Sequence, residues 1–426
     1  MSATADLLAF AGAAHCLPDS VRADALRLLG DTLAVGAAGA TAPGADAILT
    51  TAQAMGQGGD ARLIGSTDRL PAPGAAFVNG YRIHCLEWDA VHEPAVVHAM
   101  SVVTAALGAA IDRKGGCDPE QALVALAVGV DVASGLGLAA DSALSFFRPA
   151  TAGVIGAALA VARIDGAPLD HAMGLAYSSA AGTMQAHVEG SITLPFQVAN
   201  AARAAITASD LAKAGFTAPL DPLEGPFGYF QLIDQGDLSR YTRELGRIWR
   251  IAEISTKPFP SGRASHAALG ALQSFAGQSV DSIELACPPL IHRLVGRPYR
   301  PDMTAAYARL CLPFLAALML TDGRIDPRRF TPENFADPAL AALAAKVMLV
   351  ADGNDDPNAL FPQNLRITLT NGGVQTIAVP HTLGSPDAPL SPTQTQAKLD
   401  FARELAPAGS DPRLFTDPLT YFTDPT

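Results

Sequence analysis

The sequence predicts a mainly α-helical protein with two domains, in which an α+β section follows a long helical section. The 426 residues are too many for one ordinary hydrophobic core. Hydrophobic residues make up 49% of the chain and charged residues only 16%, which indicates extensive burial. Apolar residues recur at helical spacing through the first half, whereas strand-like alternation occurs almost only after Ser282.

The first section is predicted to consist of Ala-rich helices joined by short loops. Ser20 can cap a segment whose apolar residues repeat at helical spacing, and the Pro43-Gly44 pair ends that segment. Polar, glycine-containing connections follow at 145–153 and 184–195. Helices are expected within 4–41 (interrupted by a turn), 46–55, 74–110 (two helices around a polar stretch), 119–140, 150–163, 167–182 and 196–214.

The composition changes at Thr217, where prolines and glycines with aromatic neighbours replace the Ala-rich pattern. The prolines of residues 254–260 bar helix continuation and suit a crossing between domains. Residues 282–286 alternate, and the turn Asn371-Gly372-Gly373 between two strand-like runs predicts a hairpin. Further helices are expected at 265–276, 305–320, 338–346 and 394–406. We therefore predict a helical domain of residues 1–254, to which residues 390–426 return, and an α+β lid domain of residues 255–389.

Charge and cysteine content exclude several function classes. The net charge of −12 argues against nucleic acid and anionic membranes as partners. The longest apolar runs are interrupted by charge, as Asp131 interrupts residues 123–138, so no membrane span is expected. The N-terminus shows no secretory signal, and five cysteines without CxxC spacing fit a reducing compartment. A cytoplasmic location is the resulting expectation.

A cluster of ionisable residues lies between two apolar helical segments, within residues 74–103. Acids and imidazoles are costly to bury there unless they pair or take part in chemistry. A solvated helix junction and a functional site are both open alternatives. A metal site is disfavoured, because the histidines lack the His-x-x-x-His spacing of a helical zinc site. The cluster comprises Glu87, Asp89, His92, Glu93 and His98.

Four separated segments together resemble the MmgE/PrpD family, which includes 2-methylcitrate dehydratase, cis-aconitate decarboxylase and iminodisuccinate epimerase. Their order and spacing match over nearly the whole chain. The segments are Phe77-Val-Asn-Gly with His84-Cys-Leu-Glu-Trp-Asp89, Arg148-Pro-Ala-Thr-Ala-Gly, Gly190-Ser-Ile-Thr193, and Lys257-Pro-Phe-Pro-Ser-Gly-Arg-Ala-Ser-His266.

This resemblance implies a two-domain enzyme without cofactor or metal, usually a homodimer, with its site between the domains. It also implies proton removal or addition next to a carboxylate of a small di- or tricarboxylate. We expect a dehydratase of the 2-methylcitrate dehydratase type. An epimerase or isomerase, a decarboxylase, and a catalytically silent binding paralogue remain alternatives.

The sequence departs from the family pattern at several polar positions. Arg148 stands in place of the family's functional histidine, and Leu194 stands in place of its lysine. Gly262 occupies a position where some decarboxylases carry histidine. A guanidinium cannot act as a base near neutral pH, but it binds carboxylates bidentately. These departures indicate a substrate other than 2-methylcitrate, or lost activity.

The candidate site residues follow from the cluster and the resemblance. His92 and His187 are interpreted equally well as exposed loop residues, and His266 is more often structural in such an arrangement. Arg263 is open between a salt bridge within the lid and a substrate contact. The predicted catalytic residues are His98, Lys257, Asp89 and Glu87. The predicted substrate-binding residues are Arg148, Thr151, Ser191, Thr193, Arg263 and His266.

Overall fold

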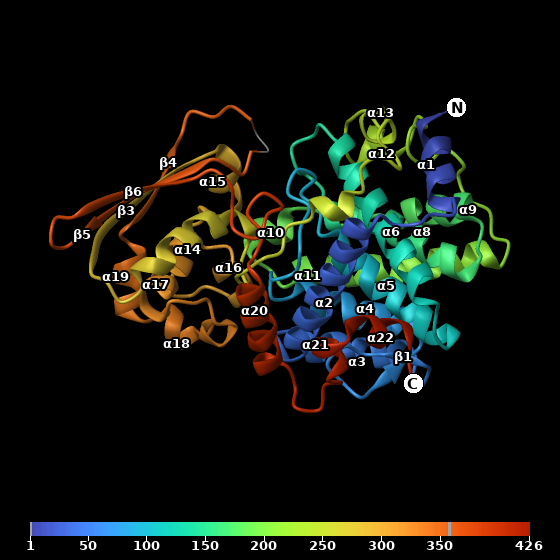
Figure 1. Cartoon of the computed structure of the whole chain (residues 1–426), viewed down its shortest axis with the longest axis horizontal. Coiled ribbons are helices and arrows are strands. Elements are labelled where there is room, and N and C mark those ends of the chain that lie inside the picture. The colour runs from blue at the N-terminus through green and yellow to red at the C-terminus, as the bar shows by residue number, and fades with distance from the viewer. Residues whose placement is uncertain (1, 357–358) are drawn as a thin grey trace.

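The computed structural model describes residues 2–356 and 359–426, and it shows two hydrophobic cores side by side (Figure 1). The larger core is helical and contains residues from both chain ends, such as Leu7 and Phe422. The smaller core lies under a sheet and contains residues from 144 to 367. The predicted class, mainly α with an α+β lid and a helical part built from both ends, is confirmed. The boundaries after residues 254 and 389 stay a prediction.

The helical part packs closely because many contact positions carry alanine or glycine. Where α6 crosses α8, a Cβ atom on Gly156 would lie 2.2 Å from the carbonyl oxygen of Gly129, so only glycine fits. The elements are α1 (Ala3–Gly12), α2 (Asp19–Ala38), η1 (Gly39–Thr41), α3 (Ala45–Met55), β1 (Ala61–Arg62), β2 (Arg69–Leu70), α4 (Ala72–His84), α5 (Ala99–Lys114), α6 (Pro119–Ala139), α7 (Arg148–Thr151), α8 (Gly153–Asp165), α9 (Leu169–Ser178), α10 (Gln185–Glu189), α11 (Thr193–Lys213), α12 (Tyr229–Leu232), α13 (Ser239–Thr242) and η2 (Arg250–Glu253).

Helix α6 is long and apolar enough to cross a membrane, contrary to the sequence expectation that Asp131 would interrupt such a run. Its most apolar stretch is 94% buried inside the protein, however, which identifies it as a core helix. Asp131 is satisfied internally, since it accepts hydrogen bonds from the Tyr241 hydroxyl at 2.7 Å and the Arg250 amide at 2.8 Å.

The lid combines short helices with a four-stranded sheet of order β4-β3-β5-β6. The predicted Asn371-Gly372 hairpin joins β5 to β6, which pair antiparallel. Strand β4 was not predicted, and it pairs parallel with β3. The elements are η3 (Arg263–Ser265), α14 (His266–Leu272), η4 (Gln273–Phe275), β3 (Val280–Cys287), α15 (Pro289–Val295), α16 (Ala305–Ala308), α17 (Leu312–Asp322), η5 (Pro327–Arg329), α18 (Pro332–Phe335), α19 (Pro338–Ala344), β4 (Val347–Ala351), β5 (Gln363–Leu369) and β6 (Val374–Val379).

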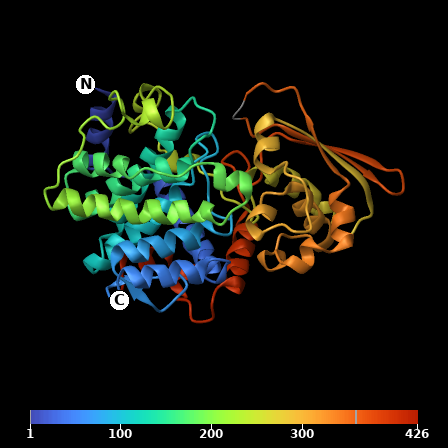
Figure 2. The same ribbon diagram turned by 180° about the vertical axis from the view of Figure 1, so that it is seen from behind.

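After the lid, the chain returns to the helical part through α20 (Pro392–Leu405), which lies along the boundary between the two halves in both views (Figures 1 and 2). Ser391 and Gln394 form a capping box that starts α20, and the helix packs on α2. The expected irregular end is instead two short helices, α21 (Arg413–Thr416) and α22 (Pro418–Thr423).

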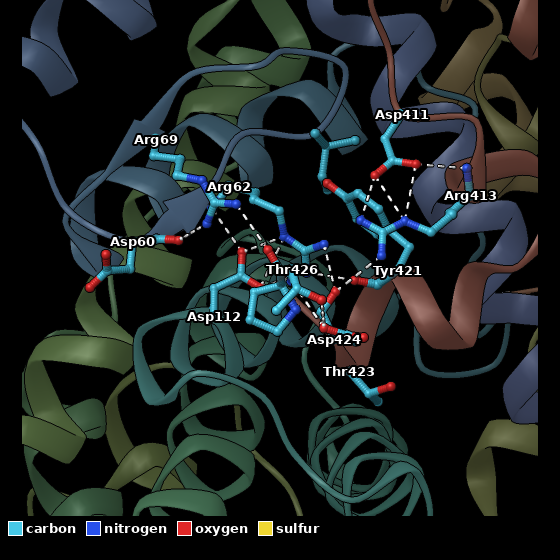
Figure 3. Close-up of polar contacts among 12 residues, drawn as sticks. Asp60, Arg62, Arg69, Asp112, Asp411, Arg413, Tyr421, Thr423, Asp424 and Thr426 are labelled. Atoms are coloured by element: carbon cyan, nitrogen blue, oxygen red, sulfur yellow. Dashed lines mark hydrogen bonds and ion pairs between the residues drawn. The ribbon is translucent and has the colours of Figure 1, made fainter.

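The end of the tail is held by arginines of the helical part (Figure 3). Arg62 on β1 forms an ion pair of 2.6 Å with Asp112 on α5 and also donates to the carbonyl oxygens of Tyr421 and Asp424. Arg413 pairs with Asp411 within the tail at 2.7 Å. These contacts explain why the tail is ordered despite its weak helical pattern.

Candidate active site

The candidate site is built on the segment that joins α4 to α5, residues 85–98. Short bridges hold this segment: the backbone of His92 pairs with Val97, and that of Val91 pairs with Ser255 at the crossing into the lid. Glu87 and Val96 both have a φ of +53°, a region that side chains with a Cβ rarely adopt. Strained backbone of this kind persists where the surrounding structure enforces it, often at functional sites.

At the centre of the segment, the fully buried Asp89 carboxylate accepts three side-chain donors on one oxygen. The Nδ1 atoms of His84 and His98 lie 2.9 Å and 3.0 Å from its Oδ2 atom, and the Ser101 hydroxyl also donates to it. Because a carboxylate only accepts, both imidazoles carry a hydrogen on Nδ1. Each ring therefore presents its Nε2 atom away from Asp89.

The Asp89 carboxylate is held in its charged form. Burial alone would raise its pKa, but the two histidines outweigh burial and place the pKa well below 3.8. The Nζ atom of Lys257 lies 3.9 Å from the other oxygen of Asp89. Asp89 can therefore orient both rings across the whole range of pH in which histidines titrate.

The pKa values of the two histidines are shifted in opposite directions. Burial disfavours the charged form of His98 and lowers its pKa below 6.5, even though Asp89 favours the charged form. For His84, burial acts the same way, but Asp89 and Glu87 together outweigh it and raise the pKa. Compared with a free imidazole, the neutral form is therefore favoured at His98 and the charged form at His84.

Lys257 anchors this segment to the crossing between the two halves. Its ammonium group donates to the backbone carbonyl oxygen of Glu87 at 2.9 Å and to the Glu87 carboxylate at 3.2 Å. Burial would raise the pKa of Glu87, but Lys257, His84 and His98 lower it to about 2. All four predicted catalytic residues thus lie in one contiguous cluster.

A cavity lies against this cluster, between the helical part and the lid. His98, 12% exposed at its side chain, lies in the cavity wall together with Glu87. Most of the wall is apolar, formed by residues such as Leu144, Phe147 and Met184. We call this space the large cavity.

The predicted substrate-binding arginines line the large cavity but are already paired. Arg148 is buried and bonds with Asp234 at 3.1 Å, and it also donates to the carbonyl oxygens of Ala95 and Ser142. Arg263 pairs with Glu93 at 2.8 Å. This ion pair joins the lid to the site segment, and a substrate contact by Arg263 stays a prediction.

The other predicted substrate-binding residues bond to neighbouring side chains. Ser191 and Thr193 bond to each other at 2.9 Å just before α11, and Thr151 lies 3.3 Å from the Tyr229 hydroxyl. The buried His266 bonds with Ser261, and burial among cations holds its pKa well below 6.5. Thr151, Thr193 and His266 do not line the large cavity.

Two histidines are more buried than the exposed-loop interpretation allowed. His92 is fully buried and lies 2.9 Å from Glu253, because the site segment folds back beneath the crossing to the lid. His187 lines the large cavity, where burial lowers its pKa to about 4. Sequence reasoning also missed the roles of His84 and Ser101. His84 had a signal, since it begins the quoted His-Cys-Leu-Glu-Trp-Asp motif; Ser101 had none.

His84, Asp89 and His98 offer three donor atoms within 4.8 Å of one another, which raises the question of a metal. The imidazole Nδ1 atoms point their hydrogens at Asp89, and Lys257 adds a positive charge beside it. Both features suit proton transfer better than metal ligation.

Comparison with known proteins gives a consistent result. The chain is 25% identical over 394 residues to a cis-aconitate decarboxylase-like protein of Aspergillus oryzae, covering 83% of this chain and 81% of that protein. It is 28% identical over 331 residues to the cis-aconitate decarboxylase of Homo sapiens, covering 72% and 68%. The cis-aconitate decarboxylase of Aspergillus terreus is 24% identical over 406 residues, covering 86% and 82%.

Family models match both halves of the chain. The MmgE/PrpD N-terminal domain matches residues 9–241, and the MmgE/PrpD C-terminal domain matches residues 259–408. The first match lies within the helical part, and the second covers the lid and α20. The chain belongs to the MmgE/PrpD family.

Proposed function

We propose that the protein is a cofactor-independent lyase that moves a proton at the carbon next to a carboxylate of a small substrate. The observation that carries this proposal is the pair of imidazoles on one buried carboxylate, with pKa values pushed apart. Titratable groups whose environments separate their pKa values are suited to act as acid and base in one reaction.

The geometry supports a distinct role for each group. His98 is the general base: its Nδ1 hydrogen is held by Asp89, so its Nε2 lone pair is available in the large cavity wall. His84 is the general acid, since Asp89 and Glu87 favour its charged form. Its Nε2 atom lies 3.5 Å from Glu87 and makes no hydrogen bond among the described residues. Lys257 supplies positive charge where an enolate-like anion develops. Asp89 orients both rings.

Two lyase reactions fit this arrangement. The acid–base pair favours dehydration, because His98 would remove the α-proton while His84 protonates the leaving hydroxyl group. The names of the relatives favour a second candidate, decarboxylation of a related polycarboxylate. In that reaction CO₂ leaves and the remaining carbanion takes a proton from His84. The absence of a lysine at Leu194 and of a histidine at Arg148 argues against the dehydratase of 2-methylcitrate itself.

Exchange of the α-proton with solvent tests the proposal directly. In D₂O, with cis-aconitate and small hydroxy acids as first probes, proton NMR should show deuterium at an α-carbon. Mass spectrometry of the products separates loss of water from loss of CO₂.

His98→Gln should reduce exchange by at least about 100-fold, the range expected for a general base. Replacement of the exposed His381 by glutamine is the matched control and should leave exchange unchanged. An unaltered rate in His98→Gln would remove His98 as the base and direct attention to Lys257. Exchange without net loss of water or CO₂ would indicate the epimerase alternative.

A homodimer and a cytoplasmic location are further parts of the proposal. All five cysteines are free, with Cys85, Cys287 and Cys311 buried, which suits a reducing compartment.

A further inference from the structure

A second, smaller cavity adjoins the large one. It lies between the end of α4, the loop before α11 and the end of α16. Glu87, Leu194 and Leu310 belong to the walls of both cavities, so the two spaces are neighbours. We call it the small cavity. His84, the proposed acid, is also part of its wall.

The small cavity contains a buried arginine that the protein leaves unpaired. Arg309 is 3% exposed, and its guanidinium has neither an ion pair nor a hydrogen bond among residues 2–356 and 359–426. The centroid of the Phe330 ring lies 5.4 Å from the Cζ atom of Arg309. The charge of Arg309 also interacts with the Glu87 carboxylate in the same wall, whose ion pair is with Lys257. The neighbouring Cys85 thiol is neutral, because burial raises its pKa to about 12.

This situation distinguishes Arg309 from the arginines of the large cavity. Arg148 and Arg263 each have a carboxylate partner, Asp234 and Glu93 respectively. Arginine stays charged even when buried, and a buried charge without a partner is costly. The free protein therefore carries the free-energy cost of this buried charge. Binding of an anionic ligand removes that cost, because the ligand supplies the missing partner.

The surroundings of Arg309 also favour an anion. Leu194 and Pro195, in the first turn of the 21-residue helix α11, lie in the same wall. The residue that caps this helix, Ile192, makes no side-chain cap bond. The partial positive charge of a helix N-terminus therefore adds to that of Arg309. The hydroxyl group of Ser191, also in the wall, offers a further hydrogen-bond donor.

The large cavity, by contrast, offers no unpaired arginine or lysine for a second carboxylate among its described wall residues. Beyond its two paired arginines, the wall is dominated by Leu144, Phe147, Met184, Leu294 and Val295. A carboxylate placed against these side chains would lose its hydration without an ionic partner. An aliphatic group there would instead gain from burial.

We propose that Arg309 binds the carboxylate of a substrate that carries a single negative charge, with an aliphatic arm in the large cavity. The carbon next to that carboxylate then lies at the junction of the two cavities, between His84 and His98. Only the placement of this carbon between His84 and His98 rests on the proposed function. It narrows the substrate class from the di- and tricarboxylates of the family to small monocarboxylates, including hydroxy acids.

Binding of simple carboxylates to the full-length protein tests the inference without requiring turnover. The probes are pentanoate, glutarate, propane-1,2,3-tricarboxylate and the neutral pentanamide, measured by calorimetry and by thermal shift. We expect pentanoate to bind more tightly than glutarate and the tricarboxylate, and pentanamide to bind at least about tenfold more weakly. Tighter binding of the tricarboxylate, or no binding of pentanoate, would overturn the inference.

Arg309→Met should weaken pentanoate binding at least about tenfold, because the charge-assisted hydrogen bonds are lost. Arg309→Lys should retain part of the binding. Arg366→Met, which removes an exposed charge from β5 of the lid, is the matched control and should bind as the parent does.

The unliganded stability separates a binding role from a structural one. Removal of an unpaired buried charge should leave the Tm of Arg309→Met unchanged or higher. A markedly lower Tm, or parental affinity for pentanoate, would show that Arg309 is not the carboxylate anchor. His98→Gln should keep the Arg309-dependent binding. If the parent shows that binding but no deuterium exchange with any probe, the proposed function fails while the inference on Arg309 stands.

Discussion

At the scale of single residues, the site depends on how burial and charge compete around Asp89. Its carboxylate is shared by His84 and His98, yet Glu87 lies 3.5 Å from the Nε2 atom of His84. The second carboxylate explains why the pKa of His84 rises, whereas burial prevails at His98 and lowers its pKa. The two imidazoles thus differ in pKa because their neighbours differ.

This difference predicts a bell-shaped dependence of kcat/KM on pH. Activity should rise as His98 loses its proton, with a pKa below 6.5, and fall as His84 loses its proton, with a pKa above 6.5. Glu87→Gln removes one carboxylate that stabilises charged His84, so the falling limb should move to lower pH. A steady-state pH profile checks both statements. A profile with only a rising limb would contradict the assignment of His84 as the acid.

The structure shows what surrounds the two residues that depart from the family pattern. Arg148 stands in place of the family's histidine. Its charge is balanced by the ion pair with Asp234, so Arg148 contributes to the cavity wall without adding an unpaired charge. Leu194 replaces the family's lysine and forms part of the wall shared by both cavities. In the wall of the small cavity, which Leu194 also lines, Arg309 of the lid is a positively charged side chain.

At the scale of secondary-structure elements, α20 connects the tail to the site. Its Lys398 forms a buried ion pair of 2.5 Å with Asp31 on α2 and donates to the carbonyl oxygen of Trp88 in the site segment at 3.3 Å. Burial raises the pKa of Asp31 and lowers that of Lys398, each opposed by the partner's charge. The pair therefore holds α20 in place only while both partners are present.

Lys398→Met should destabilise the protein by about 3–5 kcal/mol, because it leaves Asp31 buried without a cation. The pKa of Asp31 would rise further, so the folded state would bind more protons than the unfolded state, and stability would decline as pH rises above 3.8. The double variant Asp31→Asn with Lys398→Met should recover most of the loss. Urea unfolding at several pH values measures these changes. Equal stability of the single and double variants would contradict the pairing.

At the scale of the whole molecule, the site lies where two separately packed halves meet. The ion pairs of Lys257 with Glu87 and of Arg263 with Glu93 span 170 residues of sequence each. Both join the crossing into the lid to the segment between α4 and α5. These two pairs therefore fix the lid relative to the cluster around Asp89.

We also predict a homodimer. Large apolar side chains remain exposed around the start of α11, with Val188 at 65%, Ile192 at 46% and Phe196 at 40%. Contiguous exposed apolar surface commonly marks a protein interface. Light scattering at micromolar concentration should return twice the chain mass of 43.9 kDa. A mass equal to the single chain would reject the prediction.

The sequence by itself determined the features that depend on local patterns. Helical periodicity predicted most helices of the first half, and the Asn-Gly turn predicted the β5–β6 hairpin, because both signals are carried by residues close in the chain. Strand β4 had no such signal: it follows a helix directly, and its pairing partner β3 lies about 60 residues earlier. The four shared segments were enough to identify the family, since their order survives even where single residues differ.

Only the tertiary structure decided which charged side chains have ion-pair partners and which do not. Sequence alone could not show that Arg148 meets Asp234, 86 residues away, or that Arg263 meets Glu93. It could not show that His92 and His187 are buried, nor that Arg309 has no partner among the described residues. The physical reason is that the charge state and availability of a side chain depend on burial and on neighbours from distant segments, and the packing of the two halves brings those neighbours together.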